Sequence, residues 1–227
     1  ATILDTTVEG EIVTLAAAPG TLDQTAIGNV DVTARNNAVL NVTGDISNSS
    51  VLAENAATLT LTGDLNNNTV TAGSIGITGL VNVEDGSYVS KVGALEVTAS
   101  GNIEGASFTA ELDEVTLTAQ TGNIVSTTVT AATDAMLDAA QIATSNVTAQ
   151  AGIADLTADA IGGTTVVAGT GVAIDGTIAE SSLTAQTGNI TIENAALGIT
   201  NVTASAGTGN IVATDAIGWI TGGSFIA

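Results

Sequence analysis

The sequence predicts an all-β chain that forms a parallel β-helix, or β-solenoid, of about ten or eleven coils with about three short strands in each. Three observations support this prediction. A motif of the type Ser/Thr/Asn–Val–x–Ala recurs at a nearly constant spacing, and the stretch LTAQTGNI appears letter for letter at 117–124 and 183–190. Apolar residues make up 44% of the chain and aromatic residues only 2%, which suits a narrow core filled by aliphatic layers.

The recurring motif gives the period of the coil. Its aliphatic position repeats after 19 residues in most steps, and the steps range from 17 to 23 residues. A fixed period over most of a chain is the sequence signature of a solenoid. We expect a single domain over 1–227, with regular coils at 31–207 between coil or edge regions at 1–30 and 208–227. The aliphatic positions are Val13, Val32, Val51, Val70, Val89, Phe108, Val129, Val147, Val166, Leu183, Val202 and Phe225.

A second strand-and-turn unit lies inside each period. Apolar residues alternate with small or polar ones, a turn containing Gly or Asn follows, and another aliphatic residue comes next, as in LTLTGDL at 59–65. Val and Thr favour strands, while Gly and Asn tolerate the positive φ of tight turns. The two copies of LTAQTGNI are 66 residues apart, about three and a half periods. The same unit is therefore expected on two sides of a coil.

The charge of the chain excludes several classes of partner. The formal net charge is −21, because 23 acidic residues face only two basic ones, Arg35 and Lys91, and no histidine. Nothing could neutralise phosphates, so we expect no nucleic-acid binding. An anionic membrane surface would repel the chain, and no apolar run approaches the ~18 residues of a membrane-spanning helix. Without cysteine there is no disulfide and no thiolate site.

The residue types needed for catalysis are scarce. The chain has no His and no Cys, and its two basic residues are about three periods apart. β-Helix enzymes that act on polysaccharides need clustered carboxylates. Tyr88, Phe108, Trp219 and Phe225 are scattered, so they offer no aromatic platform for a sugar. We expect no enzymatic activity and no required cofactor, with a carbohydrate-active β-helix enzyme as the less favoured alternative.

Some acidic residues are expected to stack on adjacent coils. With the period above, three pairs fall at equal distances from their aliphatic positions. Like charges about 5 Å apart repel, and Ca²⁺ or another divalent cation between them would remove that cost. The alternative is that these are exposed turn residues screened by salt. The pairs are Asp45 with Asp64, Asp85 with Glu104, and Asp113 with Asp134.

The two ends of the sequence indicate self-association. The stretch at 1–20 resembles further strand, and the C-terminal GWITGGSFIA has no polar cap. An uncapped end coil is an unpaired sheet edge, so we expect subunits to stack head to tail into a homopolymer. The alternative is that the chain is a segment of a longer solenoid. The expected contact residues are Ile3, Val8, Ile12, Val13, Trp219, Ile220, Phe225 and Ile226.

The repeat pattern resembles a known family. From Val13 to Val202, the period of 19 residues with turns such as VTASGNI is similar to the repeats of filamentous-haemagglutinin-type adhesins and two-partner-secretion exoproteins. The resemblance implies a right-handed parallel β-helix, an extracellular or cell-surface location, and contacts with other cell-surface components. The family's N-terminal secretion module and great length are absent. We therefore expect a structural subunit of an extracellular fibre, sheath or surface layer, with a segment of a large adhesin as the alternative.

Overall fold

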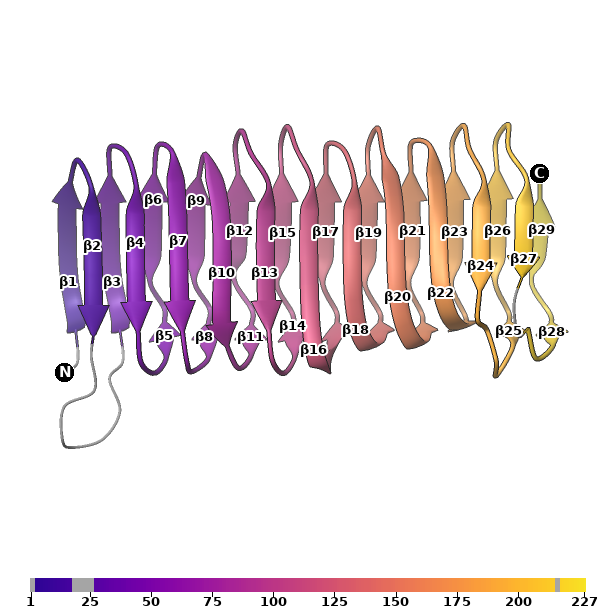
Figure 1. Cartoon of the computed structure of the whole chain (residues 1–227), viewed down its shortest axis with the longest axis horizontal. Helices are drawn as coiled ribbons and strands as arrows, with labels where there is room; N and C mark the ends of the chain where they lie inside the picture. Colours follow the sequence, from indigo (N-terminus) through magenta and orange to yellow (C-terminus); the bar gives the residue numbers. More distant parts are fainter. Residues whose placement is uncertain (1–2, 18–26, 215–216) are drawn as a thin grey trace.

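The computed structural model describes residues 3–17, 27–214 and 217–227. This part of the chain consists of 29 parallel strands joined in one continuous wound sheet, and it contains no helix. The strands form a straight solenoid with a front face, a back face and a short lower edge (Figure 1). Front strands run downward, back strands run upward, and the coil advances from the N-terminal to the C-terminal end, which makes it right-handed (Figure 1). The predicted fold is confirmed.

The back face is a column of strands, most of which contain the Ser/Thr/Asn–Val–x–Ala motif or a copy with Leu or Phe in place of Val. Each strand pairs in parallel with the equivalent strand of the next coil, and the column holds one strand per coil. Twelve strands give eleven steps between coils, in agreement with the expected number. They are β1 (Ile3–Gly10), β3 (Ile27–Ala34), β6 (Ser50–Ala53), β9 (Thr69–Ala72), β12 (Ser87–Ser90), β15 (Ser107–Ala110), β17 (Thr128–Ala131), β19 (Asn146–Ala149), β21 (Thr165–Ala168), β23 (Ser182–Ala185), β26 (Thr203–Ala206) and β29 (Ser224–Ile226).

The front face is a second column of parallel strands. Four of its strands, β16, β18, β20 and β22, continue around the corner into the lower edge. The front strands are β2 (Val13–Ala17), β4 (Ala38–Val42), β7 (Ala56–Leu61), β10 (Ser74–Leu80), β13 (Leu95–Ala99), β16 (Val115–Val125), β18 (Ala135–Ala143), β20 (Ile153–Gly162), β22 (Gly171–Ala179), β24 (Ile190–Glu193) and β27 (Ile211–Thr214). The lower edge adds β5 (Ile46–Ser47), β8 (Leu65–Asn66), β11 (Val83–Glu84), β14 (Ile103–Glu104), β25 (Ile199–Thr200) and β28 (Ile220–Thr221).

Stacked aliphatic columns form the core between the faces. Alternate residues of every strand point inward, so equivalent positions of successive coils lie directly above one another. Each column therefore buries the side chains of one coil against those of the next, which no single coil could do. The lower-edge column is the most uniform and is fully buried along its regular part: Ile27, Ile46, Leu65, Val83, Ile103, Ile124, Ile142, Ile161, Ile178 and Ile199.

The register differs from the sequence prediction at three coils. Val32 pairs with Val8 rather than Val13, Val70 pairs with Tyr88 rather than Val89, and Leu183 pairs with Ala204 rather than Val202. A shift of one residue moves a side chain to the other face of a strand, so Tyr88 is buried and Val89 points outward.

The two central aromatic residues fill the core together. Tyr88 stacks on Phe108 of the next coil, with ring centroids 5.0 Å apart and planes inclined by 12°. Both side chains are fully buried. The prediction that these aromatic residues are scattered is wrong for this pair, although burial still removes both from any surface site.

One corner of the coil has the same backbone conformation throughout. The second residue before each back strand in the regular coils has positive φ, and the residue after it is turned into the interior. Buried hydroxyls at this corner bond to neighbouring coils: the Val30 amide donates to Ser49 Oγ at 3.1 Å, and the Thr164 amide donates to Ser181 Oγ at 3.2 Å. This corner reverses the chain between the lower edge and the back face.

Candidate functional site

Both ends of the solenoid present strand edges that are unpaired within the described structure. At the N-terminal end, β1 pairs only with β3 and β2 only with β4. At the C-terminal end, β27, β28 and β29 each pair only with the preceding coil. Such an edge leaves a row of backbone N–H and C=O groups ready to pair with another strand.

Apolar side chains are exposed at the same two ends. Leu4 and Ile12 are more than half exposed at the N-terminal end, and Trp219, Ile220 and Ile226 are so at the C-terminal end. Phe225 is 40% exposed, although its equivalents in the interior coils are buried, because no further coil covers it. A contiguous set of exposed apolar residues is typical of an interaction surface.

The structure separates the predicted contact residues into two groups. Val8, Val13, Ile220 and Phe225 continue the inward columns, and Ile3 occupies the register position beside Ile27. The other three lie at corners or on an outer face. Ile12 precedes β2, Trp219 precedes β28, and Ile226 pairs with the outward Ser205.

One further end residue was missed by the sequence prediction. Ile211 continues the front column from Ile190 and is only partly buried, since it belongs to the last coil. Its position after the final GN turn, in the pattern of the earlier repeats, was the signal that could have identified it.

The first predicted acidic pair lies on adjacent coils, and one carboxylate oxygen of each side chain already accepts a hydrogen bond from the next coil. The Asp64 amide donates to Asp45 Oδ1 at 2.8 Å, and the Asn82 amide donates to Asp64 Oδ1 at 3.0 Å. The amides of Asn102 and Asn123 continue the ladder by donating to Asn82 Oδ1 and Asn102 Oδ1. These side chains therefore cap backbone donors at the corner after the front strands.

The other two acidic pairs need a correction of one residue each. Glu104 pairs with Glu84 rather than Asp85, because Tyr88, and not Val89, occupies the inward column. Asp134 precedes Ala135, which pairs with Val115, so its counterpart is Glu114 rather than Asp113. Asp134 Oδ1 accepts the Ile153 amide at 2.7 Å. In residues 3–17, 27–214 and 217–227, no group of three or more acidic side chains is placed to hold a metal ion.

The two basic residues lie in one corner column of alternating charge. Lys91 forms an ion pair with Glu111 of the next coil, and both are about half exposed. Arg35 follows Ala34, which pairs with Gly10 and Ala53, so Arg35 has Glu11 and Glu54 as its register neighbours. A solvent-open hollow of about 450 Å³ lies beside Arg35 and Glu11 at the N-terminal end. Both bases thus lie beside carboxylates of neighbouring coils, so the column is best explained by charge neutralisation.

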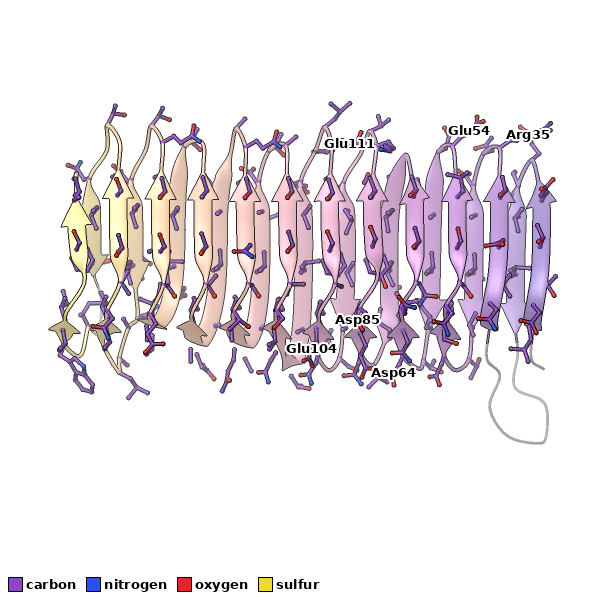
Figure 2. All side chains as sticks on the ribbon, turned by 180° about the vertical axis from the view of Figure 1, so that it is seen from behind. Arg35, Glu54, Asp64, Asp85, Glu104 and Glu111 are labelled. Carbon is purple, nitrogen blue, oxygen red and sulfur yellow. The ribbon has the colours of Figure 1, made fainter. Side chains whose placement is uncertain are left out.

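Acidic residues are concentrated on the front face and along the edges. Figure 2 shows Glu54 and Glu111 along one edge of the back view and Asp64, Asp85 and Glu104 along the other. The front face carries a further five outward carboxylates, at Glu96, Asp138, Asp155, Asp175 and Glu193.

One front-face carboxylate has a perturbed pKa. Partial burial, and then the nearby charge of Asp175, raise the pKa of Asp155 above its ordinary value. The charged form of Asp155 is therefore disfavoured in the folded chain, as expected for one acid among others on a partly desolvated sheet face.

The back face differs, because its outward positions from β6 to β29 carry no ionisable group. We call these twenty positions the hydroxyl face. Fifteen are Ser or Thr, one is Asn, and four are aliphatic. They are Ser50, Leu52, Thr69, Thr71, Ser87, Val89, Ser107, Thr109, Thr128, Thr130, Asn146, Thr148, Thr165, Val167, Ser182, Thr184, Thr203, Ser205, Ser224 and Ile226.

Comparison with known proteins gives no match to a family model, to a curated protein or to a solved structure. Across the described ranges, no helix is long and apolar enough to cross a membrane. The β-solenoid fold is compatible with a structural or an adhesin-like repeat protein. A finer assignment has to be argued from the faces and ends of this chain.

Proposed function

We propose that the chain is a structural subunit of an extracellular fibre, sheath or surface layer, which assembles head to tail by stacking of its end coils. The observation that supports this most directly is that the inward columns reach both ends as apolar residues, at strands whose outer edges are unpaired. The same end therefore offers both backbone groups and apolar side chains to a partner strand.

The repeat geometry supports a second copy of the chain as the partner. Every coil follows the last by nearly the same translation, so the first coil of one copy fits above the last coil of another. Phe225 ends the column that Val8 begins, and Ile211 ends the column that Val13 begins. Joining the copies would bring Phe225 against Val8 and let β29 pair with β1 of the next subunit. The front column has one strand fewer than the back column, so one strand position would stay open between β27 and β2 of the next subunit. The contact is head to tail, so it generates an open filament rather than a closed dimer.

The joint would give hydrogen-bond partners to backbone groups and would cover apolar side chains that are exposed at the ends of a single subunit. Added strands provide partners for backbone N–H and C=O groups, as in other cases of β-strand addition. Covering apolar side chains such as Phe225 contributes roughly 25 cal/mol per Å² of apolar surface removed from water. No acidic residue lies among the inward positions at either end, so the charge of −21 does not oppose the contact directly.

The test uses two variants that each block one end. Val8→Glu places a charge in the joint at the N-terminal end, and Phe225→Glu does so at the C-terminal end. We expect the unmodified chain to form filaments and each variant alone to stay monomeric. A mixture of equal amounts should give dimers and no longer species, because only one open end of each kind remains. Sedimentation velocity and negative-stain electron microscopy measure this.

A matched control separates charge from position. Thr78→Glu adds the same group on the outer side of β10, away from both ends and from the back face, and should leave filament length unchanged. Circular dichroism confirms that each variant keeps its β-structure. Unmodified chains that remain monomeric at high concentration would contradict the proposal, as would a mixture of the two end variants that does not dimerise. Either result would favour an adhesin segment in which further coils cover the same edges.

An extracellular or cell-surface location is part of the proposal. The resemblance of the repeats to exported adhesin repeats supports it, and the absence of cysteine is compatible with it. Protease treatment of intact cells tests this, since an exposed filament is degraded and an internal protein is protected.

A further inference from the structure

The hydroxyl face is the one extended surface of the described solenoid that carries no charge. It spans ten coils without a single Asp, Glu, Lys or Arg at an outward position, although the chain holds 23 acidic residues. The front face has five outward carboxylates over the same coils, and the edges carry further acids such as Glu54 and Glu104. Acidic residues are therefore absent from these ten coils of the back face, while Glu9 and Asp31 lie at outward positions of the first two back strands, β1 and β3.

This face is also flat and continuous. The back strands lie side by side along the whole solenoid and face one direction without winding around the axis (Figure 2). Its outward side chains are short, so no long side chain keeps a second surface at a distance. If subunits stack head to tail, the hydroxyl faces of successive subunits line up along one side of the filament, separated at each joint by β1 and β3, which carry Glu9 and Asp31 at outward positions.

We propose that the hydroxyl face is a lateral interface, through which two filaments of this chain pair back to back. A second copy in this orientation is the partner that the charges favour: front-to-front pairing brings carboxylates of like sign together, and front-to-back pairing covers the front carboxylates with a face that offers no basic group. In the back-to-back arrangement, Ser and Thr hydroxyls face one another as donors and acceptors. Val89 and Val167 add apolar contact within the same surface.

The area of the face explains why pairing depends on filament formation. Ten strands about 4.8 Å apart and about 13 Å long cover roughly 600 Å² per subunit, or about 1,200 Å² for two. That lies at the lower limit of specific interfaces, so isolated subunits should pair weakly. A filament adds these contacts along its length, so that pairing becomes strong by multivalency. In this respect the inference rests on the proposed head-to-tail assembly.

Ionic strength should control the pairing. The front carboxylates of the two filaments remain separated by both sheet layers, and their residual repulsion acts over long range. The Debye length falls from about 30 Å at 0.01 M salt to about 8 Å at 0.15 M salt. We therefore expect pairing to appear as NaCl is raised, and to need no divalent cation.

The experiment measures filament thickness by small-angle X-ray scattering, because the cross-sectional radius of gyration reports pairing independently of filament length. The unmodified chain should thicken to a paired cross-section as NaCl rises, with or without EDTA. Thr130→Glu/Thr148→Glu places two charges on adjacent coils of the hydroxyl face, and its filaments should stay single at the same salt. Thr60→Glu/Thr78→Glu is the control on adjacent coils of the front face and should pair like the unmodified chain.

A variant with added positive charges distinguishes the effect of charge within the hydroxyl face from the effect of a larger negative net charge. Thr130→Lys/Thr148→Lys lowers the magnitude of the net charge, yet it still places charges in the proposed interface, so it should also stay single. Pairing by either back-face variant would overturn the proposal, and so would equal loss of pairing in the front-face control. Thickening that requires Ca²⁺ and disappears with EDTA would overturn it in favour of cation bridging between acidic faces.

The two proposals fail in distinguishable ways. Loss of filaments in the unmodified chain would contradict head-to-tail stacking. The cross-section of short rods at high protein concentration would still report back-to-back pairing. Long filaments that stay single at every salt concentration would contradict the lateral interface alone.

Discussion

At the residue scale, the conformation of one corner position determines where each coil turns. All twelve residues at this corner have φ between 47° and 69°. Asn, Asp and Gly tolerate this left-handed region, while other residues are strained there. Ser126, Thr144 and Glu180 are the exceptions. The full set is Asp5, Asn29, Asn48, Asn67, Asp85, Gly105, Ser126, Thr144, Gly163, Glu180, Asn201 and Gly222.

Substitution at this corner should change stability in a predictable direction. Glu180→Gly should raise the free energy of unfolding by about 1 kcal/mol, because it relieves a positive φ at an exposed position. Gly163→Ala should lower it by a similar amount; a Cβ at Gly163 meets nothing closer than 3.6 Å, so only the backbone conformation is penalised. Denaturant unfolding measures both. Glu180→Gln is the control for charge, and an equal gain from that variant would contradict the backbone explanation.

A buried hydroxyl gives a second prediction at this scale. Tyr88 Oη is buried without a hydrogen-bond partner in the described structure. Tyr88→Phe removes this group while keeping the ring against Phe108, so it should stabilise the fold by about 1 kcal/mol. Burial, with a smaller contribution from Asp85, raises the pKa of Tyr88 well above its ordinary value of 10.0.

The raised pKa makes the advantage of Tyr88→Phe depend on pH. The unfolded chain ionises Tyr88 above about pH 10, while the folded chain keeps it protonated, so the unmodified fold loses stability as pH rises past that value. The variant lacks this loss, and the difference between the two should grow above pH 10. Chemical denaturation from pH 7 to pH 11 measures it. A constant difference over that range would argue that Tyr88 is reached by solvent.

At the element scale, the front sheet places carboxylates where they repel one another. Asp155→Asn should raise the free energy of unfolding at neutral pH, because burial and Asp175 disfavour the charged form of Asp155. The raised pKa means that the unmodified fold is favoured at low pH and loses stability as pH rises above the ordinary value of 3.8. The gain from the variant should therefore be present at pH 7 and vanish below pH 3.8.

Unfolding curves measured from pH 3 to pH 8 test this dependence. Asp138→Asn, on the neighbouring front strand, serves as a control that removes a carboxylate whose register partners are both threonine. An equal gain from both variants at every pH would show that general charge reduction, and not the environment of Asp155, is responsible.

The strands could be predicted from sequence more reliably than their register could. The Ser/Thr/Asn–Val–x–Ala motif, with Leu or Phe in some copies in place of Val, marks most regular back strands, and alternation correctly places most of the core. The stretch SYVS at 87–90 offers two strand-forming residues, and only the corner residue Asp85 shows that Tyr88 is the inward one. The stretch NVTASA at 201–206 is ambiguous in the same way, and Asn201 at the corner resolves it in favour of Ala204. Alignment on the corner residue, instead of the aliphatic one, would have given the observed register.

This register error led to incorrect acidic pairs and left the hydroxyl face unrecognised. A shift of one residue paired Asp85 with Glu104, where the structure pairs Glu84 with Glu104. Hydrogen bonds such as that from the Asp64 amide to Asp45 Oδ1 depend on side-chain rotamers, which spacing alone does not determine. The uncharged back face is visible in the sequence once the two outward positions of each motif are read together.

At the scale of the whole molecule, charge and shape lead to a single account. Most of the net charge of −21 is carried on the front face, the edges and the first two coils, while the inward columns are apolar up to both ends. In the proposed assembly, the solenoid grows along its axis by contacts between these apolar columns, and the hydroxyl face is where two filaments meet.

The measurement that tests head-to-tail stacking most directly is the axial repeat of the assembled filament, by helical reconstruction from electron cryo-microscopy. Each subunit contributes eleven steps between back strands, and the joint adds one more, so twelve steps of about 4.8 Å predict an axial repeat of about 58 Å with the spacing of the back strands unbroken across the joint. An axial repeat clearly longer than this, with a gap in the strand spacing between subunits, would contradict the stacking of β29 on β1.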